Sequence, residues 1–154
     1  DYGIDDIVSM GGKVYFLAAE SNAQGEELWS SDGTAVGTVL VKNINTQTTG
    51  SFNNNSSRIR YLTATSDKLF FTARPSSAST INELWVSDGT AAGTLSLHSA
   101  ASVSDITVTE NGTYFDGYDA VNGDELWKTD GTVSGTVLIK DVVPGTGSSY
   151  FYSL

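Results

Sequence analysis

The chain has 154 residues, 39% of them hydrophobic, and carries 8 Lys and Arg against 18 Asp and Glu, a formal net charge of −10. This hydrophobic content suits one packed domain or a short repeat array and argues against a disordered chain. The negative charge disfavours nucleic acid and anionic membrane surfaces as partners, whereas soluble cations and neutral glycans remain compatible. The absence of cysteine excludes disulfides and thiolate zinc sites, and no apolar stretch approaches the ~20 residues of a membrane helix.

The first unit, residues 1–50, shows four strand patterns separated by turns. A Gly-Gly pair separates the first two patterns, and an Asp-Gly-Thr turn separates the last two. Gly and Asx residues favour tight turns, whereas β-branched and aromatic runs favour strands. We therefore expect an antiparallel four-stranded unit. Its strands are predicted near Ile7 and over 13–16, 27–29 and 39–41.

Two further units, residues 51–100 and 101–147, repeat this order. Trp29, Trp85 and Trp127 mark the third strand of each unit, with spacings of 56 and 42 residues, so the units differ by loop insertions. The largest insertion contains the polar run 53–57. Residues 148–154 fall in the repeat phase of residues 1–6 and are expected to start a further unit. The remaining strands are predicted near Leu62 and Ile106 and over 68–71, 83–85, 95–97, 112–115, 125–127 and 137–139.

The second and fourth strand patterns do not alternate between apolar and polar residues. The runs at 14–17, 69–71, 39–41 and 137–139 are continuously apolar, as in strands that are buried on both faces. No window carries the 3.6-residue period of an amphipathic helix, so sheets must cover sheets. The sequence predicts an all-β protein of three tandem four-stranded antiparallel units, stacked like propeller blades.

One motif recurs in all three units, Glu-Leu-Trp-x-x-Asp-Gly-Thr-x-x-Gly-Thr. Asp accepts a hydrogen bond from the backbone two residues on, and Gly adopts positive φ, so we interpret the motif as a structural turn. The Trp side chains are expected in the core, with sugar stacking as the alternative. The structural motif residues are Trp29, Asp32, Gly33, Trp85, Asp88, Gly89, Trp127, Asp130 and Gly131.

This motif resembles the ELWxxDGT repeat family of large secreted or surface-associated bacterial proteins. The third unit ending, Lys140-Asp141-Val142 with Pro144-Gly145, is also similar to the family, whereas the second unit departs from it at His98-Ser99-Ala100. The resemblance implies blade-like architecture and an extracellular location, and it carries over no catalytic residue. The turn also resembles the Asp-box of sialidases, but the aromatic residue that closes that box is absent, so no sialidase activity is inferred.

Candidate chemistry is sparse. His98 is the single histidine and has no repeated partner, so we interpret it as a strand-end residue. Glu27, Glu83 and Glu125 could form a glycosidase pair, but acceptance of hydrogen bonds or pairing with Lys42 or Lys140 is expected instead. Calcium is the one candidate metal, because the acidic loop 116–125 is rich in oxygen ligands. Its candidate ligands are Asp116, Asp119 and Asp124.

We expect a solvated acidic loop at 116–125, with calcium binding as the alternative, and we expect no catalytic residue and no resident cofactor. The predicted function is surface binding, adhesion or self-assembly into a ring or filament, outside the cell. The predicted partners are copies of the chain or further units of a longer parent chain. The aromatic residues at 118 and 150–152 are candidates for exposed contacts. Two alternatives stay open: a lectin with glycan sites between units, and a glycan-directed hydrolase.

Overall fold

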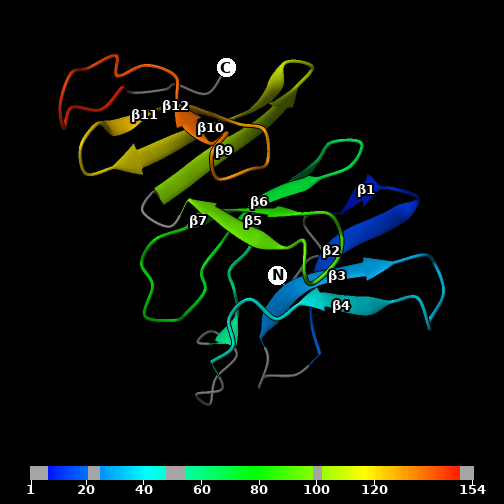
Figure 1. The fold of residues 1–154 in the computed structure, drawn as a ribbon. Helices are drawn as coiled ribbons and strands as arrows, with labels where there is room; N and C mark the ends of the chain where they lie inside the picture. Colours follow the sequence, from blue (N-terminus) through cyan, green and yellow to red (C-terminus); the bar gives the residue numbers. More distant parts are fainter. Residues whose placement is uncertain (1–6, 21–24, 48–54, 99–101, 150–154) are drawn as a thin grey trace.

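The structure is a computed structural model and describes residues 7–20, 25–47, 55–98 and 102–149 (Figure 1). Its described strands form three four-stranded antiparallel sheets, each built from four strands consecutive in the sequence. This confirms the all-β fold and its three four-stranded units. Among the described residues, no helix has the length and apolar character to cross a membrane.

Each sheet is a simple meander in which neighbouring strands pair in chain order. The first sheet contains β1 (Val8–Met10), β2 (Lys13–Ala19), β3 (Glu26–Ser31) and β4 (Val39–Lys42). The second contains β5 (Arg60–Ala64), β6 (Leu69–Ala73), β7 (Glu83–Ser87) and β8 (Leu95–His98). The third contains β9 (Ser102–Thr109), β10 (Gly112–Asp119), β11 (Gly123–Thr129) and β12 (Val137–Leu138).

The pairing register is shared between the sheets. Trp29 lies opposite Leu40, Trp85 opposite Ser96 and Trp127 opposite Leu138. An irregularity follows at the same point in the first two sheets, next to Leu28 and Leu84. The three motif copies are therefore equivalent in three dimensions, which allows position-by-position comparison of the units.

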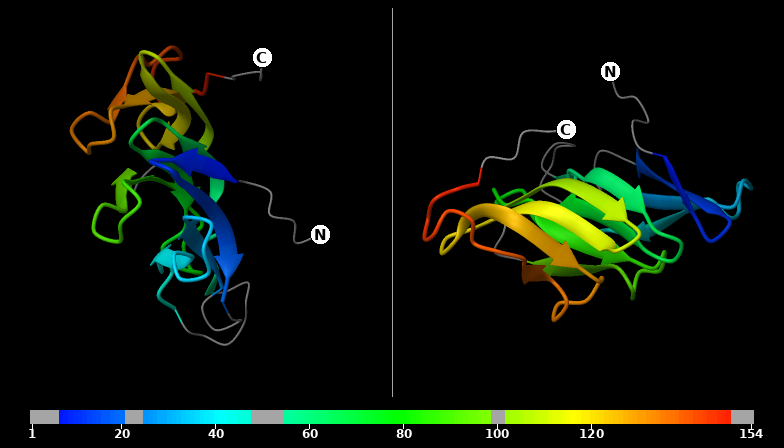
Figure 2. Two further views of the ribbon diagram at one scale, coloured as in Figure 1. Left: turned by 90° about the vertical axis from the view of Figure 1, so that its right-hand side faces the viewer. Right: turned by 90° about the horizontal axis from the view of Figure 1, so that it is seen from above.

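The sheets are layered, with the second sheet between the other two (Figures 1 and 2). One core cluster joins the first and second sheets, and it includes Tyr15 and Leu28 from the first and Phe71 and Trp85 from the second. A separate cluster joins the second and third sheets. Every residue of β6 is consequently buried. Burial of apolar side chains between sheets is what holds the units together.

The prediction of burial on both faces is wrong for the outer sheets. In β2, Tyr15 is buried whereas Val14 is exposed, and in β4 Val41 is buried whereas Val39 is exposed. Val137 and the middle-sheet residue Leu95 occupy the position of Val39 and are exposed as well, so the start of the fourth strand is open to solvent in all three sheets. Only the middle sheet has described neighbours on both faces, so the outer sheets leave one face to solvent.

Candidate functional site: the Asp-Gly-Thr loops and the end faces

The Asp-Gly-Thr loops link the third and fourth strands of each sheet and share one hydrogen-bond network. In the first unit, Asp32 Oδ1 accepts from the Thr34 N–H at 2.9 Å and from the Thr34 hydroxyl at 2.7 Å. The Thr34 hydroxyl accepts from the Gly37 N–H at 2.9 Å, and the Thr38 hydroxyl donates to the Thr34 carbonyl at 2.7 Å. The other two loops repeat these bonds. The predicted Asx turn is confirmed.

These hydrogen bonds also set the charge state of the loop aspartates. The hydroxyl and the N–H of the following Thr lower the pKa of Asp32, Asp88 and Asp130 below the usual value. Gly33 has a φ of 91°, which a residue with a side chain rarely adopts. The aspartate carboxylates accept hydrogen bonds within the turn, and their role is therefore structural.

The structure explains why the second glycine of the motif must be glycine, which the sequence did not reveal. A Cβ atom on Gly37, Gly93 or Gly135 would overlap the carboxylate of the loop aspartate. None of the three has the positive φ that would mark a left-handed turn. The glycine is therefore required for close packing on the aspartate, rather than for a second chain reversal.

The second and third loops pack on the preceding unit through their first glycine. The Tyr15 hydroxyl of the first unit lies so close to Gly89 that a Cβ there would collide with it. Likewise, the Lys68 side chain of the second unit would lie 2.8 Å from a Cβ on Gly131. Nothing lies within 4 Å of the corresponding position on Gly33. The first loop is thus the one that lacks a described neighbour.

A lysine fastens the first unit to the second. The Lys42 Nζ donates to the Thr94 carbonyl at 2.6 Å and to the Ala91 carbonyl at 3.2 Å. It also lies 5.9 Å from the centroid of the Trp85 ring, a distance typical of a cation–π contact. The sequence analysis also considered an ion pair between Lys42 and a motif glutamate, but none of these three contacts is to a glutamate.

The tryptophans of the second and third units are core residues. Trp127 is 7% exposed, stacks on Phe115 with centroids 6.2 Å apart, and donates its indole N–H to the Gly117 carbonyl at 3.0 Å. Trp85 is 8% exposed. Trp29 is only half-buried, because it lies on the outer face of the first sheet. The expectation of core packing holds for two of the three.

The glutamate before the motif leucine accepts hydrogen bonds from the segment that links its unit to the following unit, an arrangement that we call a clamp. Glu27 is buried and accepts the Ile44 N–H at 3.0 Å and the Ser57 hydroxyl at 2.5 Å. Burial raises the pKa of Glu27 to about 7, although hydrogen bonds from Ser57, Ile44 and Asn45 oppose the rise. Glu27 thus accepts hydrogen bonds as predicted, and its carboxylate is engaged by groups of the fold.

Glu125 makes the equivalent clamp in the third unit. Its carboxylate accepts the Val143 N–H at 3.2 Å and the Ser149 hydroxyl. Burial acts to raise the pKa of Glu125, but the hydrogen bonds from Ser149, Val143 and Val142 together hold it below the usual value. Glu83 differs, since it accepts the Ser96 hydroxyl at 2.8 Å within its own sheet.

The serines of these clamps were missed by the sequence analysis. The Ser56 hydroxyl accepts the Glu26 N–H at 3.0 Å, and the Ser148 hydroxyl accepts the Asp124 N–H at 3.1 Å. Residues 53–57 were interpreted as a loop insertion, yet Ser57 is fully buried. The signal was a Ser-Ser pair after the fourth strand of both units, which the unequal link lengths conceal.

Each calcium candidate accepts hydrogen bonds within the fold, although Asp116 Oδ1 is buried and has no hydrogen-bond partner among the described residues. The Asp119 carboxylate accepts the N–H groups of Val121 and Asn122 at 2.7 Å, which caps the β10–β11 turn. Asp116 accepts the Ser104 hydroxyl at 3.1 Å, and Asp124 accepts the Ser148 hydroxyl at 2.8 Å. Within the described ranges, no group of three or more acidic or histidine side chains could hold a metal ion.

Two other candidates are described only in part. The backbone of His98 pairs with Leu84, and its side chain lies outside the described part of the chain. Tyr118 is 43% exposed, whereas residues 150–152 lie outside the described residues.

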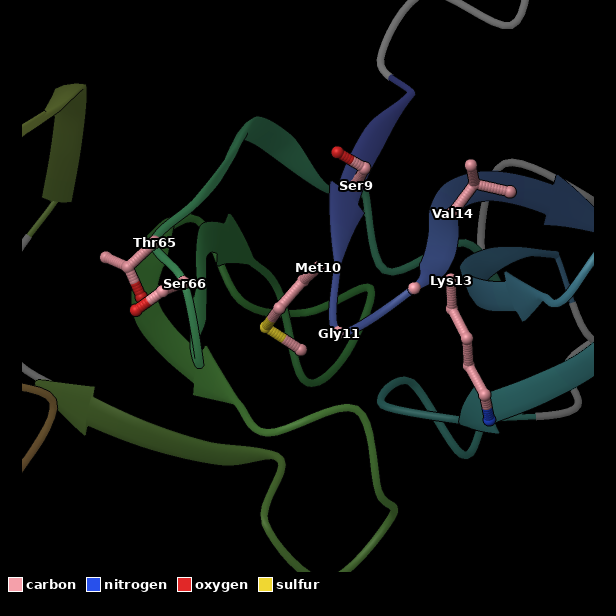
Figure 3. Close-up of a pocket in the computed structure, with 8 residues that line it drawn as sticks. Ser9, Met10, Gly11, Lys13, Val14, Thr65 and Ser66 are labelled. Atoms are coloured by element: carbon pink, nitrogen blue, oxygen red, sulfur yellow. The ribbon is translucent and has the colours of Figure 1, made fainter.

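A hollow of about 460 Å³ lies where the first turns of the first two sheets meet (Figure 3). Hydroxyls of Ser9, Thr65 and Ser66, the Met10 side chain and Lys13 contribute to its wall. None of its lining residues is acidic or aromatic. It therefore lacks the paired carboxylates of a glycosidase and the ring platform on which sugars stack.

Comparisons with protein-family models, with curated proteins and with solved structures found no match to this chain.

Proposed function

We propose that the chain is a non-enzymatic, extracellular repeat protein whose units stack like propeller blades and whose end faces bind like units. Its task is surface binding, adhesion or assembly into a ring or filament. One observation carries the proposal: the repeat positions that pack between sheets inside the chain are not covered by any described residue at its two end faces. We name these the head face, on the first sheet, and the tail face, on the third sheet.

The head face presents the positions that contact a preceding unit elsewhere. Phe16 and Trp29 are half-buried on this face. Their equivalents in the second and third units are packed against the previous sheet: Phe71 and Phe115 are at most 1% exposed, and Trp85 and Trp127 at most 8%. The same side chains are thus buried wherever a preceding sheet exists.

The tail face presents the positions that contact a following unit elsewhere. Leu126 is half-buried there, whereas its equivalents Leu28 and Leu84 are fully buried. Ile139 is 48% exposed, against 6% for its equivalent Val41. Both faces thus consist of positions that pack against each other inside the chain. The tail face is the more polar of the two, because Asp116 and Lys128 stand opposite Leu126 and Tyr114, where the first unit has Leu17 and Ser30.

The extracellular assignment rests on the sequence. Acidic, cysteine-free chains suit an oxidising exterior, and the motif resemblance points to secreted or surface-attached bacterial proteins. The ELWxxDGT family membership is part of this proposal.

The lectin alternative draws on the hollow beside Met10, which offers hydroxyls and the Lys13 ammonium to a ligand. Absence of an aromatic platform in its wall makes it the weaker candidate. A glycan array with the purified chain separates the two, because the proposed function needs no glycan signal.

The test of the proposed function is the mass of the particle in solution. Sedimentation equilibrium from about 1 μM to about 1 mM should show a mass that rises above 16.3 kDa with concentration. Since each copy carries a net charge of −10, raising salt from about 0.01 to about 0.15 M should strengthen association by screening the repulsion. A folded monomer over the whole range would overturn the proposal.

A further inference from the structure

We infer that the tail face of one copy binds the head face of a second copy through Lys140, which fastens onto the 32–38 loop and the Trp29 ring of that second copy. This inference rests on the proposed function and specifies the register of its contact. The occupant is a second copy of the chain, because the contact continues an interface that already exists between its first two units.

The template is the bond made by Lys42 between the first and second units. Its ammonium donates to the carbonyls of Ala91 and Thr94 and lies over Trp85. All three partners belong to the Glu-Leu-Trp-x-x-Asp-Gly-Thr-x-x-Gly-Thr motif of the second unit. The lysine therefore recognises the motif itself, and any other copy of the motif offers the same kind of acceptor.

Lys140 occupies the position of Lys42 in the third unit, since each follows its motif tryptophan by thirteen residues. It is exposed and makes no hydrogen bond or ion pair to any described residue. A lysine of this kind can lay its aliphatic stem along a sheet face and extend its ammonium to acceptors of a neighbouring unit, as Lys42 does. The equivalent position in the second unit is His98, so Lys140 alone repeats this chemistry.

The receiving side is the first loop, with Ala35 and Thr38 as the equivalents of Ala91 and Thr94. Its internal hydrogen bonds match those of the second loop: the Thr38 hydroxyl lies 2.7 Å from the Thr34 carbonyl, against 2.6 Å for Thr94 and Thr90. The acceptor carbonyls are consequently held by the same scaffold.

The space over the first loop is also open. Gly89 and Gly131 are covered by Tyr15 and Lys68 of the preceding units, whereas Gly33 has no atom within 4 Å of its Cβ position. Tyr114 is the third-unit equivalent of Tyr15 and lies half-buried on the tail face. Docking in the internal register brings Tyr114 of one copy over Gly33 of the next, as the lysine reaches the same loop.

A charge swap tests this contact. Lys140→Glu should weaken self-association about tenfold or more, because it places an acid against carbonyl oxygens and the face of an indole ring. Adding Ala35→Lys to the same chain should restore association to within about threefold of the original chain. Within one chain these positions belong to the first and third units, so rescue reports a contact between copies. Ala35 is exposed, so neither change removes a core group.

The matched control is Arg60→Glu, which changes the charge equally at an exposed position of the middle sheet. It should alter the dissociation constant less than about threefold. If the original chain associates but Lys140→Glu associates equally well, or Ala35→Lys fails to rescue it, the inference is overturned and the proposed function stands. If the original chain is monomeric throughout, both fall together.

Discussion

Replacing Trp127 and Trp29 by Ala, one at a time, separates core packing from an open end face. Trp127 is 7% exposed, stacks on Phe115 and bonds to the Gly117 carbonyl. Removing a ring in such a position costs about 3–5 kcal/mol of unfolding free energy. Trp29 is half-buried, so its loss should cost about 1–2 kcal/mol, because part of its surface already meets water.

Urea denaturation followed by far-UV circular dichroism measures both values, since the replacements remove a fluorophore. Measurements at about 1 μM keep self-association low, so that the two costs refer to the monomer. Trp127→Phe serves as a control that keeps a ring against Phe115 but leaves the Gly117 carbonyl without its donor, at a cost of about 1–2 kcal/mol. Equal losses for Trp29→Ala and Trp127→Ala would refute the assignment of one ring to an open face and the other to the core.

Four further outcomes follow from the hydrogen bonds and close contacts of these carboxylates. Burial raises the folded-state pKa of Glu27 from 4.5 to about 7, so the charged form of Glu27 is disfavoured in the folded state. The unfolding free energy of the original chain should therefore fall by about 3 kcal/mol relative to that of Glu27→Gln as pH rises from about 4 to about 8. Urea titration at each pH measures this difference. Glu125→Gln should show the opposite sign, since the pKa of Glu125 is lowered: the original chain loses its advantage as pH falls below the ordinary carboxyl range, and parallel curves for the two variants would contradict both assignments. Gly93→Ala should lower stability by about 1–3 kcal/mol through overlap with Asp88, and adding Asp88→Ala should recover part of that loss; simple additivity would argue against the contact. Calcium added to metal-stripped protein should leave the melting temperature unchanged, because the candidate carboxylates are engaged by the fold; a rise would restore the calcium site.

The strands and the Asp-Gly-Thr turn could be predicted because their causes are local. Asp32 bonds within two residues, and the chemistry of Gly33 follows from its own backbone. The equivalence of the units was also visible, since Trp and Asp recur at fixed offsets. Local patterns of this kind specify elements and their order, as the three meanders confirm.

The links could not be predicted because their partners are distant in sequence. Glu27 and Ser57 are separated by 30 residues, and the link between them differs in length from the one that joins Glu125 to Ser149. A Ser-Ser pair inside a polar run looks like solvent-exposed loop until a buried carboxylate is placed beside it. Likewise, the burial of the Trp29 side chain depends on whether another sheet packs on its face. A strand pattern alone does not predict how many sheets pack against that strand.

The direction shared by the sheets limits the symmetry of any closed particle built from these three units. Every motif tryptophan faces the preceding sheet, so a pair joined through two identical faces would set Trp29 against Trp29 and leave Leu126 open on both copies. Joining unlike faces keeps the internal contact and closes into a ring when the rotation permits. Closed propellers contain about four to eight units, and six is the one multiple of three in that range. If the proposed contact between unlike faces closes at six units, the ring contains two such stacks of three.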